Sequence, residues 1–462
     1  MGPLSVDILH RFLQLLPSQD VILKHLRNVP TWAYVAGGII GWMGLVRALR
    51  WRRYNAIHRE FGPKWDNGRG SITPEEAQKI ILQPILYDMP LLLNYALAFA
   101  LFKTYAVPSI SKLLCATTQL KSKDTISRRY ADTELLISTF VGCPLSGFLD
   151  PSFHLTNTGP EQKPAEDPRG ALALARTNYL HSKHRISNGD FLYTLALFVL
   201  EPNTWANRYG WRKLSPLERH AFYVFWLEIG KRMDIKDIPE NFEALQEWSQ
   251  VSPSIAVNHD EDREYERAYM VPEDSNHELA DNTLDELLSA VPEAFGLKAF
   301  AKRVSIALLD NIVREAMIYP EQPWLLKKSA QGLLIGINLF QRFFMLPRGK
   351  DSWFFPIDIR LPQIDEKASC PRLYPRKWAA RPWYRPEPTT TMGYLRDKFL
   401  VAINFYTEMP GPHLKSSGYR IEEMGPTHWE DCGHEEVTFE AAKLLGCPVT
   451  GPWSIEGRKG TT

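Results

Sequence analysis

The chain has 462 residues, of which 44% are hydrophobic and 23% are charged, close to ordinary globular usage. Its 54 basic and 53 acidic residues leave a formal net charge of +1. Because phosphate binding needs a clustered excess of positive charge, nucleic acid is not an expected partner. A chain of this length can bury a large core without a metal or disulfide framework, and five cysteines without a close pair are typical of a reducing compartment.

The first expected element is an apolar helix near the N-terminus. Nineteen uncharged residues run from Asn28 to Val46, and as a helix they would be about 28 Å long, just enough to cross a bilayer. A cleaved signal peptide or a buried core helix has similar hydrophobicity. The late start and the lack of a small-residue cleavage site favour a retained single-pass anchor, with residues 1–27 lumenal and residues 28–46 in the membrane.

Charges on the two sides of this run predict its orientation. Lys24 and Arg27 precede it, whereas four arginines follow it at once, Arg47, Arg50, Arg52 and Arg53. The positive-inside rule therefore places everything after the anchor on the cytosolic side.

Residues 47–350 are expected to form a helical domain, because helical periodicity recurs and strand-like alternation is scarce. A polar junction is expected from Gly62 to Gly70, and a helix is expected to start near Pro74, where acidic residues follow. Leu91 to Val107 is apolar enough for a second span, but Pro90, Asn94 and Lys103 favour a core helix. Further helices are expected over residues 128–140, 171–185, 188–201, 216–231, 279–290, 297–318 and 326–346. Ser187-x-x-Asp190 resembles a capping box at the start of the helix over residues 188–201. The predicted fold class is mostly α.

Proline interrupts this pattern in two places. Pro151 to Gly170 is expected to be a loop insertion. Residues 351–390 hold seven prolines and three tryptophans, which exclude regular helix. Residues 351–462 are therefore expected to form an extended segment and a C-terminal region packed on the domain.

Two helices carry the most promising chemistry. Ala171 to Arg185 lacks glycine and proline and predicts one helix with His181 and Arg185 one turn apart on the same face. Arg129 and Thr133 are one turn apart on the helix before it. A neutral imidazole can bind a metal, and an arginine can pair with a carboxylate such as a haem propionate. The same pattern also fits exposed residues that complement the C-terminal end of a helix dipole.

Several common motifs are absent. There is no P-loop, no GxSxG motif and no GxGxxG after a strand. His434 begins a sequence like the zinc motif HExxH, but Thr438 stands where the second histidine is needed. His428, Cys432 and His434 could form a small iron or zinc site without a porphyrin, yet no fourth ligand is obvious, and a polar C-terminal loop is favoured.

Six segments and the anchor carry a resemblance to a known family. The segments are Lys103 to Ser111, Arg129 to Thr133, Ala175 to Ser182, Asp190 to Phe198, Tyr269 to Pro272 and Tyr419 to Pro426. Together they resemble the fungal ER-bound oxygenases of the MpaB type, nearly end to end. The central part, roughly Arg129 to Arg185, is more distantly similar to the latex clearing protein, a rubber oxygenase.

The resemblance implies an oxidoreductase that uses haem b and dioxygen. His181 would be the axial ligand of the haem iron, Arg185 would lie beside the cofactor, and Arg129 and Thr133 would be catalytic residues. Asp132 departs from the rubber oxygenase, which has a lysine immediately before that threonine. The implied reaction is oxidative cleavage of a carbon–carbon double bond in a prenyl or terpenoid side chain of a lipophilic secondary metabolite.

The resemblance also implies a place and partners. The protein would sit in the endoplasmic reticulum membrane with its catalytic domain in the cytosol, and co-pathway enzymes on the same membrane are candidate partners. A second class of function stays open, in which the same helices form a non-catalytic, membrane-tethered protein that binds a lipid or a partner enzyme of a biosynthetic assembly.

Overall fold

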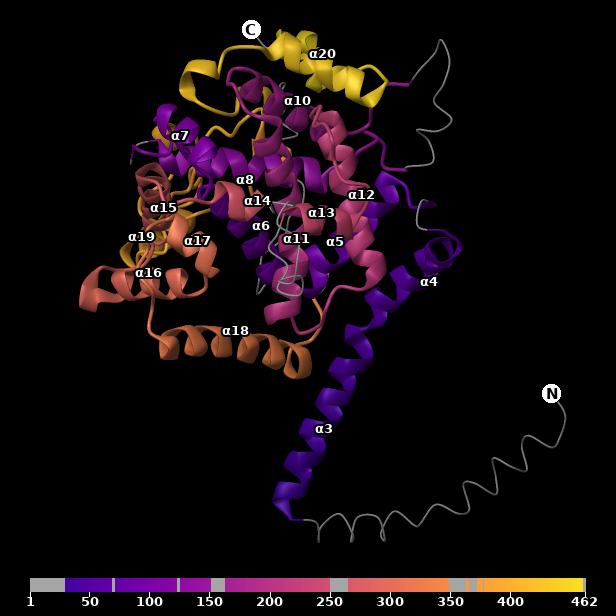
Figure 1. The fold of residues 1–462 in the computed structure, drawn as a ribbon, viewed down its shortest axis with the longest axis vertical. Coiled ribbons are helices and arrows are strands. Elements are labelled where there is room, and N and C mark those ends of the chain that lie inside the picture. The colour runs from indigo at the N-terminus through magenta and orange to yellow at the C-terminus, as the bar shows by residue number, and fades with distance from the viewer. Residues whose placement is uncertain are drawn as a thin grey trace, which may run out of the picture.

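The computed structural model describes residues 30–68, 71–122, 125–150, 163–249, 265–348, 363–364, 372–376 and 378–459. Within these ranges the chain is almost entirely helical, and one helix projects from a globular multi-helix region (Figure 1). The β structure described is a single antiparallel pair, β1 (Gln363–Ile364) with β2 (Leu373–Tyr374), and a bridge from Leu373 to Tyr419. The predicted mostly α class is confirmed.

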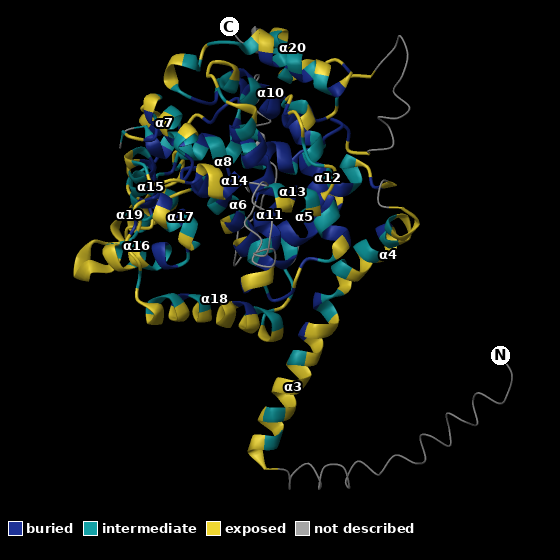
Figure 2. Cartoon of the chain, viewed as in Figure 1, coloured by how far each residue is buried: buried dark blue, intermediate teal, exposed yellow. Residues whose placement is uncertain are grey.

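The projecting helix is α3 (Thr31–Arg50), which leads directly into α4 (Arg52–Asn67). Most of α3 is exposed along its length (Figure 2), and only Val46 and Arg50 are buried. The continuous α3–α4 helix is the one unbroken helix in the described residues that is long and apolar enough to cross a membrane. It is therefore a candidate transmembrane helix. Residues 1–29, which include the predicted lumenal segment and the first two residues of the predicted span, lie outside the described residues.

The polar junction expected from Gly62 is wrong in its position, because α4 continues through Gly62 and Pro63 to Asn67. Phe61 is buried against the core, and Lys64 pairs with Glu76 of the next helix. These contacts hold the last turn of α4 helical despite the backbone hydrogen bond that Pro63 removes.

The next helices build one side of the core. α5 (Pro74–Gln83) begins with a capping box between Thr73 and Glu76, as its proline and acidic first turn predicted. A π-helical turn, η2 (Pro84–Asp88), leads into α6 (Pro90–Thr104) at a bend of 114°. α6 packs along α11, so the apolar stretch after Pro90 is a core helix in this structure.

The remaining helices complete the globular region and the C-terminal part of the chain. In chain order they are α7 (Pro108–Ala116), α8 (Ile126–Gly142), α10 (Arg169–Ser182), α11 (Asn188–Tyr209), α12 (Pro216–Arg232), α13 (Phe242–Ser249), α14 (Tyr265–Tyr269), α15 (Asp274–Leu287), α16 (Leu297–Ala307), α17 (Asn311–Ala316), α18 (Trp324–Phe344), α19 (Thr391–Ala402), α20 (His434–Leu445) and α21 (Ile455–Lys459). Short 3₁₀ turns lie at Ala294–Gly296, Pro412–Leu414, Ile421–Glu423, Thr427–Trp429 and Gly451–Trp453.

α11 is the centre of the core and packs against α6, α12, α13 and α18. Its start at Ser187, whose side chain accepts from the Asp190 N–H, was predicted. Its end was not, because the helix passes through Pro202 to Tyr209. A proline inside a helix costs about 3 kcal/mol, and burial of Leu200 and Ala206 on either side of it offsets that cost.

α10 differs from its prediction in length. It ends at Ser182 rather than at Arg185, and it packs mainly against α8 and α20. The expected helix over residues 297–318 is two helices, α16 and α17. Of the expected loop insertion, residues 151–162 lie outside the described residues, and Arg169 and Gly170 already belong to α10.

Candidate functional site

His181 lies in the last turn of α10, with its ring tilted against Phe191 at the start of α11, at 5.4 Å between ring centroids. The residue as a whole is half-buried. Its Nδ1 atom is fully shielded from solvent and has no hydrogen-bond partner among the described residues. Nε2 makes no hydrogen bond to them either and is not fully shielded. The ring therefore keeps both nitrogens free of protein partners in the described part of the chain.

The charge state of His181 follows from its surroundings. Burial lowers the pKa of His181 to about 4, and the positive charge of Arg129 and then that of His184 act in the same direction. The imidazole is therefore neutral near pH 7, which is the form that can donate a lone pair to a metal. The shift also shows that Arg129 of α8 lies within electrostatic range of His181 at the end of α10.

Arg129 and Thr133 form a linked pair one turn apart on α8, as predicted. The Thr133 hydroxyl donates to the Arg129 carbonyl oxygen at 2.7 Å, and the Arg129 guanidinium donates to the Thr133 hydroxyl oxygen. Burial lowers the pKa of Arg129, while Asp132 and Tyr105 act in the opposite direction. Arg129 is thus a largely desolvated cation bonded to Thr133, and its charge acts on the neutral His181.

Arg185 does not lie on the helix face predicted for it. α10 ends at Ser182, and Lys183 begins a turn whose N–H donates back to the Leu180 carbonyl oxygen. Arg185 follows in the connection to α11 and is exposed. Residues 183–186 form the connection, and Ser187 then has the extended backbone of the N-cap of α11. The spacing of His181 and Arg185 therefore does not translate into one helix face, and the role of Arg185 in cofactor binding stays a prediction.

Two residues of the same sequence segments have structural roles that sequence reasoning missed. Arg176, fully buried on α10, donates from its guanidinium to the carbonyl oxygens of Met424 at 2.7 Å, Trp429 at 2.7 Å and Cys432 at 2.8 Å. We call the segment that it holds, residues 419–433, the C-terminal clamp. The arginine had no signal in the sequence, because its partners are backbone atoms far along the chain.

Asp132 is the second of these residues. The apolar set Leu135, Leu136 and Phe140 leads to the expectation that this charged residue turns elsewhere, but it is 1% exposed. Its carboxylate accepts from the Tyr384 hydroxyl at 2.6 Å and from the Gly425 N–H at 3.0 Å, and Arg128 lies 3.6 Å away. It shares a face with the buried Leu136 one turn later. Asp132 therefore fastens α8 to the C-terminal clamp.

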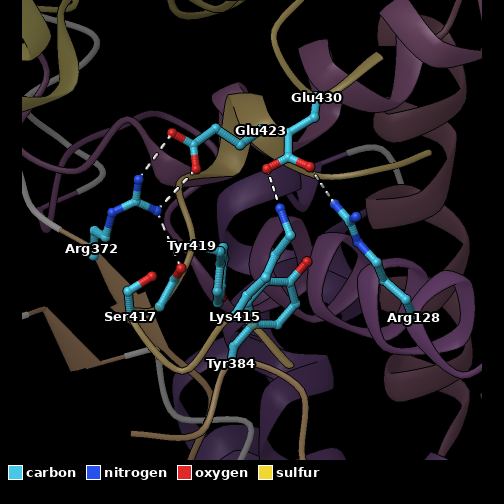
Figure 3. Close-up of a pocket in the computed structure, with 9 residues that line it drawn as sticks. Arg128, Arg372, Tyr384, Lys415, Ser417, Tyr419, Glu423 and Glu430 are labelled. Atoms are coloured by element: carbon cyan, nitrogen blue, oxygen red, sulfur yellow. Dashed lines mark hydrogen bonds and ion pairs between the residues drawn. The ribbon is translucent and has the colours of Figure 1, made fainter. Parts of the chain in front are cut away.

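A polar pocket lies between α8 and the C-terminal clamp (Figure 3). Its charged side chains pair with one another: Arg372 contacts Glu423 at 3.0 Å, Arg128 contacts Glu430 at 3.0 Å, and Lys415 also pairs with Glu430. Each charge in the pocket thus has a partner within it. The ion pairs in this pocket connect α8 to the C-terminal part of the chain. None of the predicted site residues lines the pocket.

The alternative metal site near the C-terminus is not formed by the described residues. The Nε2 atom of His434 lies 2.7 Å from the Glu430 carbonyl oxygen, and the His428 ring packs on Trp429. Among the residues that the structure describes, no three histidine, cysteine or acidic side chains are grouped so that they could hold a metal ion. The favoured interpretation of this region as polar surface fits these contacts.

Comparison with known proteins gives the class. No family model matches the chain. ER-bound oxygenase mpaB' of Penicillium brevicompactum is 29% identical over 430 residues, covering 90% of this chain and 93% of the relative. ER-bound oxygenase mpaB of Penicillium roqueforti (strain FM164) is 31% identical over 323 residues, covering 66% of this chain and 97% of the relative. The similarity indicates an oxygenase and hence an oxidoreductase.

The family follows from the same comparison. A second ER-bound oxygenase mpaB, also from Penicillium brevicompactum, is 32% identical over 264 residues. The chain belongs to the family of ER-bound oxygenases named mpaB. The resemblance to the MpaB type is confirmed, and an ER-bound protein fits the exposed apolar helix α3.

Proposed function

We propose that this chain is an oxygenase anchored in the endoplasmic reticulum membrane that uses haem b and dioxygen to cleave a carbon–carbon double bond in the prenyl side chain of a lipophilic secondary metabolite. Membership of the family supports the oxygenase reaction. The observation that carries the haem proposal is the neutral His181, which has a buried nitrogen that no described residue satisfies and lies within electrostatic range of Arg129.

The described residues fit a haem better than a metal ion held by protein alone. A buried nitrogen without a partner costs roughly 1–3 kcal/mol, and such a cost in a native protein calls for a functional explanation. In the described part of the chain, His181 belongs to no group of three histidine, cysteine or acidic side chains that could hold a metal ion. A porphyrin brings four nitrogen ligands of its own, so a single axial imidazole is sufficient to complete it.

Each site residue then has a defined task. Haem b, when bound, would supply the one-electron and dioxygen chemistry that amino-acid side chains lack. His181 would offer a neutral ring nitrogen as axial ligand. Arg129 would neutralise a propionate or stabilise negative charge that develops in the reaction, and Thr133 would hold its guanidinium in place. We assign this task to Arg129 because its charge acts on the pKa of His181, whereas Arg185 is exposed.

The membrane anchor is consistent with a lipophilic substrate. Each buried methylene group contributes about 0.8 kcal/mol to transfer out of water, so a prenyl chain concentrates in the bilayer. α3 would hold the domain at that surface. Substrate would then reach the domain laterally from the membrane rather than from free solution.

The decisive test is an absorption spectrum with a pyridine haemochrome assay on detergent-solubilised protein. We expect a haem b signal that is lost in His181→Ala and kept in His184→Ala, the matched control three residues away. Well-folded parent protein without any iron would overturn the haem proposal. A haem signal that survives His181→Ala would assign the axial ligand to another residue.

Orientation has a separate test. The chain contains no Asn-x-Ser/Thr acceptor of its own, so introduced glycosylation sites give a clean signal. We expect an acceptor placed at residue 10 to be modified and one placed at residue 160 to stay unmodified. The reverse pattern would put the domain in the lumen.

A further inference from the structure

The polarity of α18 is the reverse of that of an ordinary surface helix. Lys328 and Ser329 in its first turns are exposed, but from residue 332 onward its polar side chains face the domain: Gln341 donates to the Asp88 carbonyl oxygen at 2.8 Å, and Arg342 donates to the Trp211 carbonyl oxygen at 3.3 Å. Asn338 is buried beside them. Every residue from 332 to 344 that is exposed is apolar or glycine, namely Gly332, Leu333, Ile335, Gly336, Ile337, Leu339, Phe340, Phe343 and Phe344.

An outward apolar face of this kind needs a partner. A surface helix normally turns its apolar stripe toward the core and its polar residues toward water. In Figure 2 the exposed side of α18 points away from the globular region, along its lower edge. The neighbouring helix α16 packs against α18 and adds exposed apolar side chains at Leu297 and Phe300. A contiguous set of exposed apolar side chains like this one is typical of an interaction surface.

The position of α18 indicates which partner covers it. The C-terminal end of α18 is fastened to α3, the candidate transmembrane helix (Figure 1). The Trp42 indole N–H donates to the Phe344 carbonyl oxygen at 2.8 Å. Arg50 donates to the Met345 carbonyl oxygen, and Arg53 donates to the Arg348 carbonyl oxygen at 2.6 Å. The C-terminal end of α18 therefore lies where α3 meets the globular region.

The level at which α18 meets α3 can be compared with the expected edge of the hydrocarbon core. The uncharged run ends at Val46, four residues after Trp42. At ~1.5 Å per residue, Trp42 lies about 6 Å inside that end. Interfacial amphipathic helices lie with their apolar face about 5–10 Å into the boundary between headgroups and acyl chains. The end of α18 that bonds to Trp42 is thus at the depth at which such helices rest.

We infer that α18 is a second membrane-contacting element, whose apolar face lies in the leaflet from which α3 emerges and whose polar face carries the domain. The partner is the lipid bilayer, because the patch continues directly into the exposed apolar surface of α3. The exposed Arg47 and Arg52 at the junction are suited to lipid headgroups. The domain would then rest on the membrane along its base instead of hanging from α3 alone. This inference rests on the membrane anchoring proposed above.

The test measures the depth of single positions in the full-length chain reconstituted into phosphatidylcholine vesicles. An environment-sensitive fluorophore is attached at Leu333→Cys or Phe340→Cys on the outward face of α18. Ile40→Cys on α3 reports the anchor itself, and Glu436→Cys on α20 is the control on the far end of the globular region (Figure 1). Unsubstituted protein labelled in parallel subtracts the signal of the native cysteines.

We expect the probes at positions 333 and 340 to shift to shorter wavelength and to be quenched by lipids that carry a spin label near the headgroup. The probe at position 436 should be unaffected. Quenching at position 40 without quenching at 333 and 340 would overturn the role of α18 and leave the anchor intact. No quenching at position 40 would overturn the anchor. A shift at 333 and 340 that depends on protein concentration and not on the spin-labelled lipid would assign the patch to a second copy of the chain and overturn the inference.

Discussion

The C-terminal clamp and the surroundings of His181 both involve helices α8 and α10. Buried polar groups have hydrogen-bond partners at the clamp, whereas a buried nitrogen of His181 has none among the described residues. On α10, Arg176 satisfies three backbone carbonyl oxygens, whereas His181, little more than one turn later, keeps an unpartnered buried nitrogen. On α8, Asp132 accepts hydrogen bonds from Tyr384 and from Gly425 of the clamp, and the adjacent Thr133 accepts a hydrogen bond from Arg129. The partnered groups hold the chain together, whereas the nitrogen of His181 is left unsatisfied by the described residues.

This difference is not visible in the family resemblance. The segment from Arg129 to Thr133 contains both Asp132 and Thr133, and the segment from Ala175 to Ser182 contains both Arg176 and His181. Similarity to relatives marks all of them alike. Hydrogen-bond accounting separates them, because a buried polar group with all of its partners needs no further explanation.

The largest effect should come from removing the guanidinium of the clamp. Arg176→Met removes three charge-assisted hydrogen bonds at once, and only the Trp429 carbonyl oxygen keeps another donor, the Cys432 N–H. We therefore expect a loss of roughly 3–5 kcal/mol in the free energy of unfolding. Urea unfolding of the detergent-solubilised protein, followed by circular dichroism, measures it. Arg208→Met is the control, because Arg208 pairs with Asp310 at the surface and should cost less than ~1 kcal/mol. Equal losses would show that Arg176 does not hold the clamp.

We expect added side-chain volume at the contact between the C-terminal clamp and α10 to lower the free energy of unfolding by a similar amount. Gly433 has a φ of +77°, and a Cβ there would lie 2.3 Å from the Tyr179 ring. Gly446 has a similar φ of +65° and nothing within 4 Å. We expect Gly446→Ala to cost about 1–2 kcal/mol from backbone strain alone, and Gly433→Ala roughly 2–5 kcal/mol because the clash is added. Equal costs in the same unfolding measurement would mean that Tyr179 moves aside freely.

At His181 we expect a substitution to raise the free energy of unfolding instead of lowering it. In haem-free protein, His181→Leu removes an unsatisfied buried nitrogen, so we expect the free energy of unfolding to rise by about 1–2 kcal/mol. His58 is the matched control, because its ring nitrogens contact the Tyr54 carbonyl oxygen at 2.9 Å and the Ser215 hydroxyl at 2.8 Å. His58→Leu should destabilise by a similar amount. A loss of stability in His181→Leu would make His181 a structural histidine like His58.

The sequence predicted the helices well where the signal is local. Capping residues such as Ser187 and Ser215 mark helix starts, because their hydrogen bonds reach only three residues ahead. Helix ends were less predictable. α11 continues past Pro202 because buried residues on both sides stabilise it, and α10 stops at Ser182, before the connection to the N-cap of the next helix. Both outcomes depend on packing or on a neighbouring element.

For the site, sequence and resemblance named His181, Arg129 and Thr133, and the structure places Arg129 near His181. The clamp was missed because its partners are distant: the carbonyl oxygens that Arg176 binds lie 248 to 256 residues further along the chain. A backbone acceptor has no residue type to recognise. Long-range contacts of this kind leave no spacing pattern in one sequence.

The smallest effect is a pH dependence at Asp132, which tests whether complete hydrogen bonding fully offsets burial. Burial raises the pKa of Asp132, although Arg128, Tyr384 and Gly425 act against the shift. Between the unfolded value of about 3.9 and the raised folded value, the folded chain therefore holds a proton that the unfolded chain has lost. The stability that Asp132 contributes falls as pH rises through this window, by about 1.4 kcal/mol for each pH unit it spans, and is constant above it.

Asp132→Asn cannot titrate, so the difference in free energy of unfolding between the parent and the variant isolates this group. Urea unfolding from pH 4 to pH 8 should show the parent losing stability relative to Asp132→Asn as pH rises above about 4. If the parent instead gains stability relative to Asp132→Asn as pH rises, the hydrogen bonds from Tyr384 and Gly425 outweigh the cost of burying the carboxylate. The clamp would then stabilise the ionised carboxylate of Asp132. The contrast between this satisfied group and the unpartnered nitrogen of His181 would be larger than the raised pKa of Asp132 implies.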